Sequence, residues 1–129
     1  MTLIIDTHCW LWWLSEPDRL RGSSVDLLRR SDTTVMLSAA SSWEIAIKHS
    51  LGKLSLPEAP AAFVATRMER ERTEALAIQH AHALAVASLP PHHTDPFDRL
   101  LIAQAIVERV PIMTADRAFR AYAIDVIDG

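Results

Sequence analysis

The sequence has few of the residues that mark several common protein classes. Its single cysteine, Cys9, cannot form an internal disulfide, and we expect a buried, reduced thiol. Its three glycines form neither a GxGxxG motif nor a Walker loop, the motifs that hold phosphates against a helix N-terminus. These absences exclude a disulfide-stapled scaffold and a nucleotide-binding Rossmann or P-loop protein.

A long apolar run is also missing. The N-terminal segment MTLIIDTHCWLWWL is apolar, but Asp6 interrupts it well short of the length that spans a membrane. The segment has neither a basic leader nor a small-residue cleavage pattern. We therefore expect neither secretion nor membrane insertion, and a cytoplasmic location, which also suits the reduced Cys9.

Strong net charge is absent too. Thirteen Lys and Arg stand against 16 Asp and Glu, which gives a net charge of −3. The chain therefore lacks the global basic field of a DNA-coating protein, although an RNA-cutting enzyme with metal-binding acids stays possible. With 129 residues, 50% hydrophobic and 22% charged, the sequence predicts a single domain over residues 1–129.

Short apolar runs alternate with longer amphipathic stretches along the chain. The predicted strands cover residues 3–5, 35–37, 74–78, 110–113 and 124–127. The predicted helices cover residues 7–14, 23–30, 41–51, 60–72, 79–88 and 95–108, with a further helical segment at 116–122. The helix at 95–108 is apolar on nearly every side, so we expect it to be buried. This alternation predicts an α/β domain with helices flanking a central parallel sheet.

Four acidic residues stand where strand-like runs end or helices begin. They are Asp6 after LII, Glu44 in SWEIAIK, Asp98 in DPFDRLLIAQA and Asp116 in IMTAD. Ligands gather at the carboxyl ends of parallel strands, and all four acids can reach that edge. Clustered carboxylates raise one another's pKa unless a cation or a shared proton neutralises them. Because Mg²⁺ and Mn²⁺ prefer oxygen ligands and leave room for phosphate, the quartet predicts phosphoryl chemistry.

Two of these acids also fit purely structural roles. Ser41-x-x-Glu44 matches a capping box, and Glu44 forms a favourable i, i+4 pair with Lys48. Asp116 can cap the segment that follows it. For each of these acids the structural and functional explanations are evenly matched.

The segment DPFD also reads as a helix start. Asp95 is the expected N-cap and Pro96 the first helical residue, which leaves Asp98 near the positive end of the helix dipole. Asp6 has the weakest structural explanation, because it ends a buried strand and no turn follows. One shared site accounts for all four acids better than four separate structural roles.

Other residues give weaker signals. No histidine pair has the HExxH spacing of a zinc enzyme and no GxSxG elbow is present. His93 is expected to be a solvated loop residue; the less favoured alternative is that it contacts a scissile phosphate. Four tryptophans fill the core or, in one case, an interface: Trp10, Trp12, Trp13 and Trp43. Four basic residues near the acids are candidates for phosphate contacts: Lys48, Lys53, Arg99 and Arg117.

Four sequence blocks together resemble one known family. IIDTHCWLWWL, SAASSWEIAIKHSLGKLSL, LPPHHTDPFDRLLIAQA and the TAD, RAF and AY segments occur in this order over nearly the full length. In these blocks the chain resembles the PIN-domain, VapC-type toxin ribonucleases of type II toxin–antitoxin pairs. The resemblance implies a PIN-like three-layer fold, an endoribonuclease dependent on Mg²⁺ or Mn²⁺, a small VapB-type antitoxin partner and a homodimer.

The resemblance also implies residue roles. The acidic site would be Asp6, Glu44, Asp98 and Asp116, with Asp6, Asp98 and Asp116 on the metal and Glu44 orienting or deprotonating the attacking water. Thr114 would be a hydroxyl helper, and Thr7 matches the hydroxyl residue that commonly follows the first aspartate. We expect RNA phosphodiester hydrolysis by a metal-activated water.

Two rival functions are open at this point. Other metal-dependent phosphohydrolases fit poorly, because His8 stands where a haloacid-dehalogenase-like enzyme has its second aspartate, and no lysine follows Lys53 as a receiver domain requires. The second rival is a catalytically silent PIN-like module that binds a protein partner or RNA. The intact acidic quartet argues against it.

Overall fold

Five short strands form one parallel sheet in the order β3-β2-β1-β4-β5. The strands are β1 (Thr2–Ile5), β2 (Thr34–Ser38), β3 (Glu74–Leu76), β4 (Ile112–Thr114) and β5 (Val126–Asp128). All of residues 1–129 are described by the computed structural model. The chain leaves β1 toward β2 and later returns to the other side of β1 with β4. The strand order therefore reverses between β1 and β4, and such a switch point is where open parallel sheets bind ligands.

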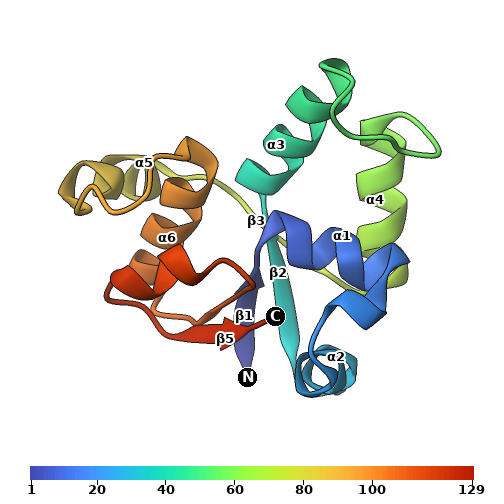
Figure 1. The fold of residues 1–129 in the computed structure, drawn as a ribbon, viewed down its shortest axis with the longest axis horizontal. Helices are drawn as coiled ribbons and strands as arrows, with labels where there is room; N and C mark the ends of the chain where they lie inside the picture. The colour runs from blue at the N-terminus through green and yellow to red at the C-terminus, as the bar shows by residue number, and fades with distance from the viewer.

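Helices cover both faces of this sheet (Figure 1). They are α1 (Thr7–Ser15), α2 (Gly22–Arg29), α3 (Ala39–Ser50), α4 (Pro60–Arg70), α5 (His80–Ala85) and α6 (Pro96–Glu108), with 3₁₀ turns η1 (Pro17–Arg19), η2 (Val86–Ser88) and η3 (Arg117–Ala121). Helices α1, α2 and α4 lie on one side, and α5 and α6 on the other. The predicted three-layer α/β architecture with a central parallel sheet is confirmed. No helix is both long and apolar enough for a membrane span.

The alternation of side chains along β1 supplies both halves of the core. Leu3 and Ile5 pack into one apolar cluster with Trp10 of α1, and Ile4 packs into the other with Leu101 of α6. All three strand residues are fully buried. A strand buried on both faces reads as a continuous apolar run, which is why the short LII segment was recognisable in the sequence.

Several element boundaries differ from the sequence prediction. Helix α3 starts at Ala39 with Ser38 as its N-cap, so the capping box predicted at Ser41 is wrong. Helix α4 stops at Arg70, because Arg72 adopts a positive φ of 54° that ends helical geometry. Strand β4 begins two residues later than predicted, since Pro111 has no N–H to give to a ladder.

Three further differences concern helical segments and the last strand. The predicted helix at 79–88 divides into α5 and η2, the segment at 116–122 is the 3₁₀ turn η3, and β5 begins at Val126. Helix α6 is buried over its centre, but Ile106 and Val107 in its last turn are exposed, so the expectation of full burial is wrong there. Among the tryptophans, Trp10 is fully buried and Trp43 is 55% exposed.

Candidate active site

Asp6 is fixed by two elements at the end of β1. It is the N-cap of α1, and its Oδ1 accepts a hydrogen bond of 2.7 Å from the N–H of Cys9. Its Oδ2 accepts one of 2.5 Å from the hydroxyl of Thr114 at the end of β4. Burial raises the pKa of Asp6, and the bonds from Thr114 and Cys9 partly oppose that rise. The switch point of the sheet therefore carries a buried carboxylate with a fixed orientation.

Asp98 reaches the same edge from the start of α6. Asp95 is the N-cap of this helix, as predicted, and accepts hydrogen bonds from two N–H groups of the first turn. Burial raises the pKa of Asp98 to about 7, and the charge of Asp95 adds to the rise. His93 opposes it, while Glu44 and Asp6 raise it further. Asp98 therefore lies within electrostatic reach of both acids, and the negative charges gather here.

Asp116 combines a capping role with a place beside the other acids. Its Oδ1 accepts a hydrogen bond of 2.9 Å from the N–H of Ala118, which makes Asp116 the N-cap of η3. Its own N–H donates to the Thr114 hydroxyl at 3.0 Å, and that hydroxyl in turn donates to Asp6. The predicted cap is confirmed, and the other carboxylate oxygen, Oδ2, faces the His93 ring. The two explanations offered for this residue are compatible.

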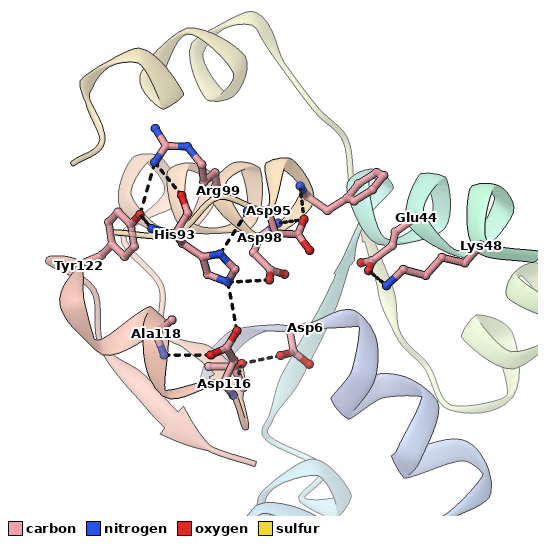
Figure 2. Close-up of polar contacts among 12 residues, drawn as sticks. Asp6, Glu44, Lys48, His93, Asp95, Asp98, Arg99, Asp116, Ala118 and Tyr122 are labelled. Atoms are coloured by element: carbon pink, nitrogen blue, oxygen red, sulfur yellow. Dashed lines mark hydrogen bonds and ion pairs between the residues drawn. The ribbon is translucent and has the colours of Figure 1, made fainter. Parts of the chain in front are cut away.

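His93 joins two of the acids (Figure 2). Its Nε2 lies 3.0 Å from Oδ2 of Asp98 and 3.1 Å from Oδ2 of Asp116. The side chain is only 15% exposed, so the favoured interpretation of His93 as a solvated loop residue is wrong. Its backbone N–H donates to the hydroxyl of Tyr122 at 2.9 Å. The loop that follows η2 is thus tied to the acidic site.

Glu44 approaches from α3 and has one oxygen without a partner. Only 1% of its side chain is exposed, and Oε2 accepts a 2.5 Å bond from Lys48, which confirms the predicted i, i+4 pair. Oε1 is buried with no hydrogen-bond partner. Such an atom is costly because nothing replaces its lost hydration, and it points to a ligand group that completes the site.

The two predicted hydroxyl helpers lie in different surroundings. Thr114 sits between Asp6 and Asp116 and bonds to both. Thr7 instead donates to the Ser41 hydroxyl at 2.8 Å and so links α1 to α3. Thr114 is therefore placed to orient the acids directly, whereas Thr7 holds in register the helices that carry Asp6 and Glu44.

The donor set suits a hard divalent cation. Carboxylates of Asp98 and Asp116 lie about His93, and Asp6 and Glu44 are close enough to Asp98 to raise its pKa; Mg²⁺ and Mn²⁺ prefer such oxygens. His93, Asp98 and Asp116 each present one ligand-type atom, all within 4.8 Å of one another. Together with the unpartnered Oε1 of Glu44, this grouping fits a cation that could activate water beside a phosphodiester.

Other chemistry is poorly supported at this edge. Cys9 is fully buried, as predicted, and burial raises the pKa of its thiol far above the usual range, so it is a poor nucleophile.

Local sequence signals missed the role of Tyr122, whose hydroxyl accepts a hydrogen bond from the backbone N–H of His93 and donates one to the Pro90 carbonyl at 3.0 Å. They also missed the buried His82, which bonds to Glu108 at 3.0 Å. Both contacts join segments far apart in the chain, which local periodicity does not reveal.

Comparison with known proteins places the chain in a family. The PIN domain profile matches residues 3–125. Ribonuclease VapC22 of Mycobacterium tuberculosis is 30% identical over 122 residues, which are 94% of this chain and 92% of that protein. Ribonuclease VapC16 of the same organism is 53% identical over 49 residues, which are 38% of this chain and only 35% of that protein.

A solved structure gives the same fold. VapBC2 from Rickettsia felis, in a crystal structure with a DNA fragment from its promoter, aligns with a TM-score of 0.74 and 14% identity over 98% of both chains. The likeness covers the sheet and the helices on both its faces. The chain is a VapC-type member of the PIN-domain family.

Proposed function

We propose that this protein is the ribonuclease toxin of a toxin–antitoxin pair, and that it hydrolyses RNA phosphodiesters with the help of a divalent cation, Mg²⁺ or Mn²⁺. The observation that carries the proposal is the grouping of Asp98 and Asp116 about His93, with Asp6 and Glu44 close enough to raise the pKa of Asp98. Oε1 of Glu44 is also buried there without a hydrogen-bond partner. The similarity to two proteins named as VapC ribonucleases supports the same activity.

Each acid has a distinct role in this proposal. Asp6, Asp98 and Asp116 would hold the cation, directly or through water, and Thr114 would keep Asp6 oriented through its hydroxyl. When bound, the cation would lower the pKa of a water molecule and stabilise charge on the phosphodiester. Glu44 would orient that water or take its proton, because its free Oε1 has no competing partner.

Two of the four basic residues near the acids already have partners within the protein, and two do not. Lys48 is paired with Glu44. The Arg99 guanidinium donates to backbone carbonyls, among them those of Pro90 and Val86, so its role is structural. Lys53 and Arg117 form no ion pair. Lys53 lines a hollow together with Glu44, and Arg117, which follows Asp116 in the chain, lines another. We assign these two to contacts with RNA phosphates.

Two hollows lie beside these free cations. One has a volume of 350 Å³ between α1 and α3 and includes Thr7, Glu44 and Lys53. The other, of 480 Å³, lies at the ends of β4 and β5 and includes Arg117 and Arg120. An RNA strand that enters the first hollow would pass Glu44, which lines it together with Lys53.

A protein partner is part of the proposal. The solved structure from Rickettsia felis is that of VapBC2, and by analogy this chain would be inhibited by a small VapB-type antitoxin and form a homodimer. Trp43 is 55% exposed and packs edge-on against Phe97 at 5.0 Å between ring centroids. Exposed aromatic side chains are typical of protein interfaces, so Trp43 is our candidate for the antitoxin surface.

The test is cleavage of total RNA by the antitoxin-free protein. We expect discrete fragments with Mg²⁺ or Mn²⁺, none with EDTA, and a loss on the order of a hundredfold for Asp98→Asn. Glu108→Gln is the matched control, because Glu108 is a helical acid that bonds to a histidine far from the carboxylate site. Absence of cleavage by a folded, metal-loaded protein would favour the catalytically silent module. Full activity of Asp98→Asn would instead leave the ribonuclease standing and overturn the assignment of Asp98 to its site.

A further inference from the structure

His93 is fixed by its surroundings before it meets the acids. Its backbone N–H donates to the Tyr122 hydroxyl at 2.9 Å, and its ring Nδ1 accepts from the N–H of Asp95 at 3.2 Å. The ring packs edge-on against Phe119, with 5.9 Å between centroids and an interplanar angle of 82°. The orientation of the ring is therefore built into the fold and does not depend on the carboxylates alone.

The bond from Asp95 decides which ring nitrogen carries the hydrogen. A backbone N–H can only donate, so Nδ1 must offer its lone pair. The hydrogen is then on Nε2, which lies 3.0 Å from Asp98 and 3.1 Å from Asp116. In this tautomer the Nε2–H forms a hydrogen bond with Asp116 and lies at ion-pair distance from Asp98, and Nε2 has no lone pair to give to a cation.

This arrangement is the reverse of a metal-binding histidine. A histidine ligand usually donates the N–H of its second ring nitrogen to a carboxylate or carbonyl, which fixes the tautomer for ligation. For His93 to ligate through Nε2, Nδ1 would have to carry a hydrogen and oppose the N–H of Asp95. His93 therefore fits as an occupant of the space between the acids, although its distances also suit a ligand.

We infer that the Nε2–H of His93 occupies the position of the cation between Asp98 and Asp116 when no metal is bound, an inference that rests on the metal site of the proposed function. The cation must displace this Nε2–H in order to bind both carboxylates. Without metal, the Nε2–H holds the two like charges in place. With metal, the carboxylate oxygens that face Nε2 are needed as ligands. His93 thus keeps the empty site assembled and at the same time weakens its affinity for the cation.

The test is the Mn²⁺ affinity of the metal-stripped full-length protein, measured from the electron paramagnetic resonance signal of free Mn²⁺ without RNA. We expect His93→Ala and His93→Asn to bind about tenfold more tightly, the value of roughly one net hydrogen bond to a charged group. His93→Asn keeps an acceptor near the Asp95 N–H, which protects the loop. His92→Ala is the control, because His92 packs edge-on to Tyr122 at 5.4 Å and bonds to neither acid, and its affinity should stay within about twofold of the parent.

The outcomes separate this inference from the proposed function. Weaker binding in both His93 variants would make the side chain a ligand and overturn the inference, and unchanged binding would overturn it too. Asp98→Asn tests the underlying site in the same titration. If the parent binds Mn²⁺ through Asp98 and the His93 variants do not differ from it, only the inferred role of His93 fails. If neither the parent nor the His93 variants bind Mn²⁺, the proposed metal site fails with it.

Discussion

His82 and His93 lie in different regions, but the same hydrogen-bond arrangement orients both rings. In each ring Nδ1 accepts a hydrogen bond from a backbone N–H, that of Gln79 for His82 and that of Asp95 for His93. Each ring therefore turns its Nε2–H toward a carboxylate. His82 joins α5 to α6 through Glu108, and His93 joins the loop before α6 to the first turn of that helix. Neither residue belongs to a recognised sequence motif for metal binding.

The two regions differ in the number of carboxylates that the ring meets. His82 meets only Glu108, whose side chain is 38% exposed and keeps part of its hydration. His93 meets both Asp98 and Asp116. One donor and one carboxylate make a satisfied pair, whereas one donor between two carboxylates leaves excess negative charge for a cation to relieve. The same histidine geometry is therefore structural in one region and part of a binding site in the other.

The largest expected difference between the two regions is in stability. His82 is 1% exposed, and its ring also receives a 3.3 Å contact from Gln104. His82→Ala should lower the free energy of unfolding by about 2–4 kcal/mol, because a cavity and unpaired polar groups remain. His93→Ala should lower it by about 1 kcal/mol or less in EDTA, since the freed acids can take up water. Urea denaturation of both variants measures the difference, and equal losses would remove the distinction.

A smaller effect should depend on pH. The folded-state pKa of Asp98 is raised by burial to about 7 from the ordinary 3.8. The protonated form is therefore favoured in the fold, and this stabilisation is complete below about pH 4 and is lost as the pH rises through about 7. Asp98→Asn removes the buried charge, so it should stabilise the metal-free protein by about 1–3 kcal/mol at pH 8 and have little effect at pH 4.

Thermal unfolding of the parent and Asp98→Asn across this pH range, in EDTA, measures that effect. The stability of Glu108→Gln relative to the parent should not rise in this way toward pH 8, because Glu108 is partly hydrated and faces a single donor. A parent protein whose stability does not fall between pH 5 and pH 8 relative to Asp98→Asn would contradict the picture of an overcharged site.

Much of the fold could be predicted from local patterns. The apolar LII run gave β1, and the Asp95-Pro96 pair gave the start of α6 to within a residue, because an N-cap and a proline act locally. The alternation of strands and helices was enough to predict the parallel sheet. One boundary failed where a distant contact contributes, at Ser38, whose hydroxyl also reaches Gln104 of α6.

The site was predicted only in part for the same reason. The resemblance and the strand ends indicated which acids to consider. In the structure Asp98 and Asp116 lie about His93, and Asp6 and Glu44 are close enough to Asp98 to raise its pKa. The position of His93 depends on Asp95, Asp98, Asp116 and Tyr122 together. No periodic pattern records that the loop before α6 folds back onto η3, so the sequence alone favoured a solvated residue.

The smallest expected effect is on stability, when the His82–Glu108 pair loses the charge of Glu108. Glu108→Gln retains an acceptor for the Nε2–H of His82, and the side chain at this position is partly exposed. We therefore expect the free energy of unfolding to change by no more than about 0.5 kcal/mol, as for exposed charge pairs, with Mn²⁺ affinity unchanged. The same urea titration and Mn²⁺ titration apply. A loss above about 1 kcal/mol would show that the charge of Glu108 matters to the fold, and a loss of Mn²⁺ affinity would mean that the two histidine regions are coupled. Either result would contradict the distinction between a histidine that faces one carboxylate and a histidine that faces two. The His82–Glu108 pair would then contribute to stability through its charge, or to Mn²⁺ binding, and we expect these properties only of His93 with Asp98 and Asp116.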